Sequence, residues 1–169
     1  MKRFADRSDA GKQLAQRLES FKGQRDIIVL GLPRGGMPVA SEIARALEVP
    51  LDVLIVRKLG VPGQEELAMG AIASGGALVL NNDIVKTLAL DEEAIEREVV
   101  REQTELERRD MRYRGAKPFP SLAGKTVIVV DDGIATGATM RAAVKALRQH
   151  RPARLIIAAP TSARDTYYT

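Results

Sequence analysis

The sequence predicts an α/β fold with a central parallel sheet flanked by helices, and three observations lead to it. Apolar, largely β-branched runs at Asp26–Leu30, Pro50–Val56 and Thr126–Val130 are typical of strands that are buried on both faces of a parallel sheet. Segments with helical periodicity separate these runs, and such alternation indicates βαβ units. Turns rich in glycine follow the first and the last of the three runs.

Length and composition predict one domain over residues 1–169. Hydrophobic residues make up 45% of the chain, enough for a substantial core. The chain has no cysteine, which excludes disulfides and a thiolate nucleophile. No apolar run is long enough to span a membrane, and the N-terminus lacks a signal-peptide pattern. We therefore expect a cytoplasmic protein without a membrane partner.

The charge balance favours an anionic ligand. The formal net charge is +4, which suits a polyanionic small molecule, although a nucleic-acid surface would give the same sign. Aromatic residues account for only 4% of the chain, too few for an extended platform on which bases stack. Nucleic acid is therefore the less favoured partner.

The chain begins with a helical pattern and continues into the first strand. Ser8–Phe21 reads as a packing helix that is capped by Ser8 or Asp9. The strand Asp26–Leu30 then leads into the loop G-L-P-R-G-G, and a helix follows over Val39–Leu47. The loop exposes backbone amides, and Arg34 adds a fork-shaped anion donor. A tight turn with an exposed arginine is the alternative interpretation.

The second strand, Pro50–Val56, carries two cations at its end. Arg57 and Lys58 follow it directly, and the carboxyl ends of parallel strands meet at one edge of a sheet, where open α/β sheets bind ligands. These cations would then stabilise an anionic leaving group. A solvated strand end is the alternative.

A hairpin and a long helix follow. Gly75-Gly76 lies between alternating small and apolar residues, which indicates a β-hairpin that projects from the sheet as a lid, a surface hairpin or a dimer arm. Asp91–Tyr113 has the pattern of a helix with a narrow apolar stripe at Ile95, Val99, Leu106 and Tyr113, and the stripe has a break near Glu102. Most of its remaining residues are charged and predict a solvated face.

The strand Thr126–Val130 ends at two carboxylates, Asp131 and Asp132, and a Gly/Thr turn follows before a helix over Thr139–Arg148. Two adjacent acids could hold vicinal hydroxyls or a hydrated Mg²⁺, while turn amides at a helix N-terminus suit a phosphate. An acidic turn with a threonine N-cap is the alternative. The combination favours a sugar-phosphate ligand.

The stretch V-I-V-V-D-D-G-I-A-T-G-A-T resembles the loop by which type I phosphoribosyltransferases (PRTases) bind 5-phosphoribosyl-1-pyrophosphate (PRPP). The resemblance implies the type I PRTase fold, with the hairpin as a flap over the site and a reduced hood. It implies that Asp131 and Asp132 contact the ribose hydroxyls, that PRPP binds with Mg²⁺, and that a nitrogenous base displaces pyrophosphate. It implies that the loop with Arg34, Gly35 and Gly36 binds the pyrophosphate, and that the turn after the acids wraps the 5′-phosphate through Gly133, Ala135, Thr136, Gly137, Ala138 and Thr139. From their place at a strand end, Arg57 and Lys58 are expected to contact the pyrophosphate or the base side.

Two departures from the family pattern bear on the substrate. Members that act on 6-oxopurines carry an aspartate where this chain has Ala135, which disfavours that substrate class. The family usually continues beyond the strand that ends at Pro160 with a segment that completes the base-binding hood, whereas this sequence stops nine residues later. Either Tyr167 and Tyr168 supply a minimal stacking surface for a base, or the base site is absent. The alternative to a transferase is a regulatory module that binds PRPP without turnover and is linked to nucleic acid.

A homodimer is expected as well. The arm A-M-G-A-I-A-S-G-G-A-L-V-L has few charges, and an isolated two-stranded hairpin is marginally stable in water. In the resembling family, an arm or arginines of one subunit reach toward the neighbour's site. Arg108 and Arg109 would take that role here.

Overall fold

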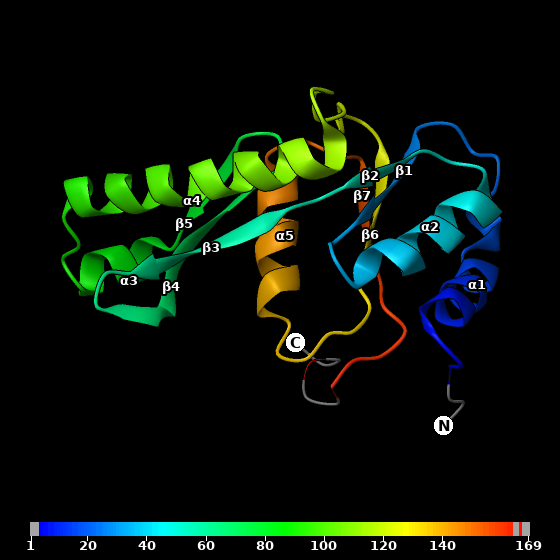
Figure 1. The fold of residues 1–169 in the computed structure, drawn as a ribbon, viewed down its shortest axis with the longest axis horizontal. Helices are drawn as coiled ribbons and strands as arrows, with labels where there is room; N and C mark the ends of the chain where they lie inside the picture. Colours follow the sequence, from blue (N-terminus) through cyan, green and yellow to red (C-terminus); the bar gives the residue numbers. More distant parts are fainter. Residues whose placement is uncertain (1–3, 164–165, 167–169) are drawn as a thin grey trace. The chain divides into compact units, whose positions relative to one another are not determined.

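The computed structural model describes residues 4–163 and residue 166 (Figure 1). The chain forms two compact units, and both are assembled from separate segments. The first unit combines the chain up to Leu54, Pro120–Gly137 and the chain from Arg151 onward. The second combines Ile55–Phe119 and Ala138–His150.

The first unit is built on a parallel sheet of four strands. They are β1 (Ile27–Gly31), β2 (Leu51–Val53), β6 (Thr126–Val130) and β7 (Arg154–Ala158), in the order β2-β1-β6-β7. Their pairing is parallel throughout. This sheet confirms the predicted α/β class, and β6 has the bounds expected from its β-branched run.

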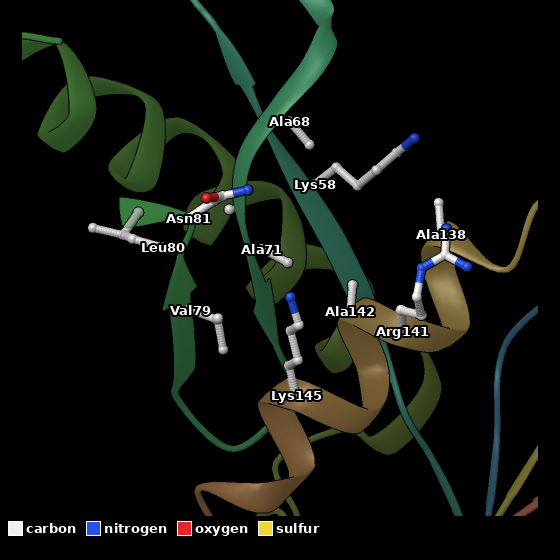
Figure 2. Close-up of a pocket in the computed structure, with 11 residues that line it drawn as sticks. Lys58, Ala68, Ala71, Val79, Leu80, Asn81, Ala138, Arg141, Ala142 and Lys145 are labelled. Atoms are coloured by element: carbon white, nitrogen blue, oxygen red, sulfur yellow. The ribbon is translucent and has the colours of Figure 1, made fainter. Parts of the chain in front are cut away.

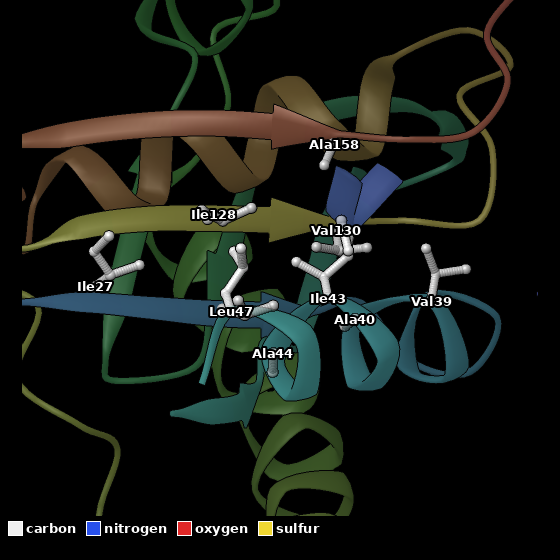
Figure 3. Packing of buried hydrophobic residues seen from close by; sticks show 11 residues of the cluster. Ile27, Val39, Ala40, Ile43, Ala44, Leu47, Ile128, Val130 and Ala158 are labelled. Atoms are coloured by element: carbon white, nitrogen blue, oxygen red, sulfur yellow. The ribbon is translucent and has the colours of Figure 1, made fainter. Parts of the chain in front are cut away.

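Helix α2 (Gly36–Leu47) packs against this sheet. Val39, Ile43 and Leu47 are buried on its inner face, where they meet side chains of the central strands such as Ile128 (Figure 3). Spacings of three and four residues put these side chains on one face of the helix. The helix starts three residues before the predicted Val39, so the glycine loop runs directly into it.

Helix α1 (Arg7–Arg17) packs on α2. The approach is close, because a Cβ added at Gly11 would lie 2.7 Å from Cβ of Glu42. The predicted cap was wrong: Asp6 is the N-cap and accepts a hydrogen bond from the Asp9 N–H at 2.8 Å. The predicted helical segment also ends in a separate 3₁₀ turn, η1 (Glu19–Phe21).

The second unit contains an antiparallel sheet and three helices. Its strands pair in the order β3-β4-β5. The elements are β3 (Val56–Val61), β4 (Gln64–Ala73), β5 (Ala77–Leu80), α3 (Asn82–Thr87), α4 (Glu92–Arg114) and α5 (Ala138–Arg148).

The turn at Gly75 and Gly76 joins β4 to β5, as the hairpin pattern predicted. Both residues have positive φ, 81° and 79°, which glycine adopts without a steric cost. A second hairpin, which the sequence analysis did not predict, joins β3 to β4 at Gly63, whose φ is 79°. The arm is therefore a three-stranded sheet rather than a single hairpin.

Helix α4 has a shorter apolar stripe than predicted. Leu106 is buried, but the Tyr113 side chain is 42% exposed, and the charged residue Glu102 is buried at 7% exposure. The break in the stripe at Glu102 therefore reflects a buried ion pair, described below. Within residues 4–163, no helix is long and apolar enough to cross a membrane.

Candidate functional site

The acidic pair lies at the carboxyl end of β6 in the first unit. The Asp131 N–H bonds to the carbonyl oxygen of Ala158 at 3.2 Å, and the Leu32 N–H bonds to that of Val130 at 2.9 Å. These bonds fix the ends of β1, β6 and β7 at one edge of the sheet. In open parallel sheets this edge is where ligands bind.

The glycine loop after β1 lies directly against the acidic pair. A Cβ added at Gly35 would be 2.5 Å from Cγ of Asp132, and one at Gly36 would be 2.6 Å from the carbonyl oxygen of Val130. Only glycine allows this approach, because real Cβ atoms do not come so close to their neighbours. The structure thus brings together two segments that are about a hundred residues apart in the sequence.

Arg34 occupies the exposed part of this loop. Its peptide bond with Pro33 is cis. Within the described part of the chain, the Arg34 guanidinium has no acidic partner, so it is available to an anion. The role predicted for it stays a prediction.

Arg7, at the start of α1, was missed by the sequence analysis. Its Nε and Nη2 both donate to Oδ2 of Asp132, at 3.0 and 2.8 Å. No local pattern could have shown this contact, because 125 positions separate the two residues. The Arg7 side chain is 60% exposed, so the pair contributes little to stability and can exchange with a ligand.

Burial raises the pKa of Asp131 above its ordinary value of 3.8. The hydrogen bond from the Asp132 N–H to Oδ1 of Asp131, at 2.8 Å, acts in the opposite direction, and the charge of Asp132 adds to the rise in pKa. Carboxylates placed in this way hold excess negative charge at neutral pH, which a cation or hydroxyl donors would relieve.

The acidic pair fits Mg²⁺ only together with a ligand that supplies further oxygens. Within residues 4–163, no group of three or more His, Cys, Asp or Glu side chains could hold a metal ion alone. Mg²⁺ is commonly bound by one or two carboxylates, water and substrate phosphates. Asp131 and Asp132 match that donor set.

We expect Asp131→Asn to stabilise the free protein at neutral pH. Because the pKa of Asp131 is higher in the folded than in the unfolded chain, the native state holds the proton longer, and stability falls as pH rises between the two values. The amide removes this cost. Thermal melts at about pH 7 and about pH 3 should show an advantage of the variant that disappears at the lower pH. An advantage independent of pH would contradict the assignment of the raised pKa.

The turn after the acids is held by the segment beyond β7. The Ile134 N–H bonds to the carbonyl oxygen of Thr161 at 3.0 Å, and the Thr166 hydroxyl donates to that of Ala135 at 2.6 Å. A Cβ at Gly133 would lie 3.1 Å from Oγ1 of Thr161. The turn is therefore supported along its length, while Ala135 and Thr136 stay exposed.

The turn ends at Gly137, which is buried and has a φ of 75°. The chain continues into α5 at Ala138, one residue before the predicted start at Thr139. A glycine turn followed by a helix N-terminus presents backbone N–H groups to a phosphate. The residues predicted at the C-terminus for base stacking, Tyr167 and Tyr168, lie outside the described residues.

The sequence analysis expected Arg57 and Lys58 at the end of a parallel strand, and the structure shows that this is wrong. Strand β2 stops at Val53, and Arg57 and Lys58 lie inside β3, opposite Ile72 and Ala71. The sequence did not indicate this change of sheet, because the residues from Val53 to Val56 are all apolar. Nε of Arg57 bonds to Oε2 of the buried Glu102 at 2.7 Å, so Arg57 fastens α4 to the antiparallel sheet.

Arg108 and Arg109 both contact Glu105 on the same helix. Arg108 Nε and Nη2 donate to the carboxylate at 2.9 and 2.8 Å, and Arg109 Nε donates at 2.9 Å. The hydrogen bond from Arg108 is the largest cause and the one from Arg109 the next, and together they lower the pKa of Glu105 to about 2. The expected role of the two arginines in a neighbouring subunit stays a prediction.

Comparison with known proteins gives a consistent result. The family model described as "Phosphoribosyl transferase domain" matches residues 6–168. The "Putative phosphoribosyl transferase Rv0571c" of Mycobacterium tuberculosis H37Rv is 50% identical over 165 residues, or 98% of this chain. The chain spans 37% of that relative's length.

Solved structures extend the comparison to the fold. The protein TT1426 from Thermus thermophilus superposes with a TM-score of 0.86 at 42% identity, over 99% of this chain and 79% of that one. The purine phosphoribosyltransferase from Pyrococcus horikoshii superposes with a TM-score of 0.52 at 19% identity, over 90% of this chain and 71% of that one. The latter likeness supports the type I PRTase fold.

Proposed function

This chain belongs to the phosphoribosyl transferase family, and on that premise we propose that it binds Mg²⁺-PRPP and transfers the phosphoribosyl group to a nitrogenous base. The products are a nucleoside monophosphate and pyrophosphate. The single observation that carries the proposal is the contact of the glycine loop at Gly35 with the carboxylate of Asp132. One ligand that bears both a diol and a diphosphate would use both segments.

Each part of PRPP has a candidate partner. Asp131 and Asp132 accept hydrogen bonds from the ribose hydroxyls, and the turn over 135–139 donates backbone N–H groups to the 5′-phosphate. Arg34 and the amide of Gly35 take the pyrophosphate. Gly36, whose N–H bonds to the carbonyl oxygen of Leu32 at 2.9 Å, serves the close approach of the loop to the end of β6. Bound Mg²⁺ neutralises charge on the pyrophosphate and makes it a better leaving group.

The reaction needs no nucleophilic side chain. The bond from the anomeric carbon to the pyrophosphate oxygen breaks with its electron pair, and the lone pair of the base nitrogen forms the new C–N bond. The carboxylates hold the ribose in position while positive charge develops at the anomeric carbon, and Arg34 stabilises the leaving group. The base nitrogen's proton, where it has one, passes to solvent.

Pyrophosphate release tests the transferase proposal. We expect release from PRPP with Mg²⁺ in the presence of at least one base from a panel of purines, pyrimidines and their analogues. Chelation of Mg²⁺ should abolish the release. Asp132→Asn should abolish pyrophosphate release as well. The matched control Glu48→Gln, a change at an exposed position of the same unit, should leave the release intact. Binding of PRPP without release in every arm would exclude the transferase.

A second candidate is a module that binds PRPP without transferring it. One observation favours it: the guanidinium of Arg57, a predicted contact for the leaving group, is held by the buried carboxylate of Glu102. That contact is thus occupied by the protein itself. The same assay separates the two candidates, since a regulatory module binds PRPP and releases no pyrophosphate.

A further inference from the structure

A cavity of about 320 Å³ lies in the second unit between α5 and the antiparallel sheet (Figure 2). Its floor consists of small residues: Ala68, Gly70 and Ala71 from β4 and Ala142 from α5. Small side chains leave room for a ligand and expose the backbone to it. Val79 of β5 adds an apolar wall.

Among the residues that the structure describes, three cations line this cavity and no acidic residue does. Lys58 comes from β3, and Arg141 and Lys145 come from α5, one helical turn apart on the same face. Figure 2 shows the three side chains among the residues that line the cavity. Within residues 4–163, none of them forms an ion pair, in contrast to Arg57, Arg108 and Arg109 on the same unit.

A neutral donor completes the lining. Oδ1 of Asn81 caps helix α3, accepting from the N–H groups of Asp83 at 3.2 Å and Ile84 at 3.4 Å. Its oxygen is thus engaged by the backbone, which leaves Nδ2 as the group that Asn81 offers to the cavity. Donors without a competing acceptor are what an oxyanion requires.

We propose that this cavity is a binding site for a phosphate-bearing ligand, held by Lys58, Arg141 and Lys145 with Asn81 as a neutral donor. Like charges around a concavity repel each other, and an anion that enters it relieves that repulsion. The planar guanidinium of Arg141 suits two phosphate oxygens, and the lysines act as point charges.

The inference goes beyond the proposed transferase site. Arg141 and Lys145 belong to none of the segments that the transferase proposal uses for PRPP. Lys58 and Ala138, which also line the cavity, have predicted roles at PRPP as well. The ligand chemistry has two possible sources: free pyrophosphate, or a second molecule that carries a phosphate group. The experiment below distinguishes them.

The absence of cysteine from the chain provides a direct test. Val79→Cys introduces a single thiol that lines the cavity, and Leu78→Cys introduces one at the neighbouring position of the same strand, which does not line it and is 40% exposed. Adjacent residues of a strand point to opposite faces of the sheet, so Leu78→Cys is a control thiol on the face opposite to that of Val79→Cys. The readout is the rate of alkylation by neutral iodoacetamide at constant ionic strength.

We expect inorganic pyrophosphate to slow alkylation of Val79→Cys about tenfold at a tenfold excess over its Kd, because only about a tenth of the molecules then have an empty cavity. Alkylation of Leu78→Cys should be unchanged. Adding Arg141→Gln and Lys145→Gln should abolish the protection, while Arg148→Gln, an exposed cation on the same helix outside the cavity lining, should preserve it.

Parallel arms with ribose 5-phosphate and adenosine diphosphate identify the source. Protection by pyrophosphate alone indicates the free inorganic ion, and protection by an organic phosphate indicates a second phosphorylated ligand. Protection in no arm, or protection that survives Arg141→Gln with Lys145→Gln, overturns the proposal. Asp131→Asn with Asp132→Asn leaves this readout unchanged, so failure of the transferase proposal is distinguishable from failure of this one.

Discussion

Asp131→Asn combined with Asp132→Asn is expected to weaken binding of Mg²⁺-PRPP by roughly 2 to 4 kcal/mol. The double variant keeps the shape of both side chains but removes the charges that hold hydroxyls and a hydrated cation. The Asp132 N–H can still bond to the oxygen at position 131, as it does at 2.8 Å now, so the turn should keep its conformation. Isothermal titration calorimetry measures the loss.

A matched control separates this effect from a change in net charge. Glu19→Gln with Glu48→Gln removes two negative charges from exposed positions of the same unit and should leave PRPP affinity unchanged. Thermal melts confirm that both double variants are folded. If the aspartate variant retained its affinity for PRPP within a factor of about two, the proposed role of the carboxylates would be wrong.

Glu102→Ala is expected to destabilise the protein by about 2 to 3 kcal/mol. Glu102 is buried, and its carboxylate lies 2.7 Å from Nε of Arg57, whose side chain is 27% exposed. Removing the acid leaves a partly buried guanidinium without a partner. The expected loss is below that for a fully buried pair, because water can reach part of Arg57. Urea unfolding at neutral pH measures it.

The double variant Glu102→Leu with Arg57→Leu distinguishes a buried pair from simple loss of packing. Replacing both partners by apolar residues should recover much of the stability that the single change loses. Glu93→Ala is the control, since its pair with Arg97 is long, 3.7 Å, and highly exposed, and it should cost less than about 1 kcal/mol. Equal losses in Glu102→Ala and the double variant would mean that the ion pair contributes nothing.

The sequence was most informative where local pattern and tertiary environment agree. Strand β6 has the predicted bounds, because an unbroken β-branched run favours a strand and the central position in the sheet buries every residue after Thr126. The run Pro50–Val56 was less informative about strand bounds. Leu54 and Ile55 are as buried as a strand would require, so composition does not show that the chain leaves one sheet after Val53 and enters another at Val56.

The contacts of the candidate site were also predictable from the sequence only in part. The proximity of Asp132 to Gly35 follows from a general rule, since both segments end neighbouring parallel strands. The contact of Arg7 with Asp132 has no such rule behind it, because a helix of ordinary sequence supplies the arginine from the other end of the chain. The partner of Arg57 was equally invisible, although the interruption of the α4 stripe at Glu102 was a signal that a charge is buried there.

Thermal melting of the unmodified protein with and without Mg²⁺-PRPP is the most direct test of PRPP binding. A ligand that binds only the native state adds about 2.7 kcal/mol of stability at a hundredfold excess over its Kd. We therefore expect PRPP with Mg²⁺ to raise the melting temperature more than pyrophosphate or a nucleoside monophosphate alone, and chelation of Mg²⁺ to reduce the shift. A melting temperature unchanged by PRPP at about millimolar concentration, where weak ligands of Kd near 1 mM would register, would contradict both the transferase and the binding module.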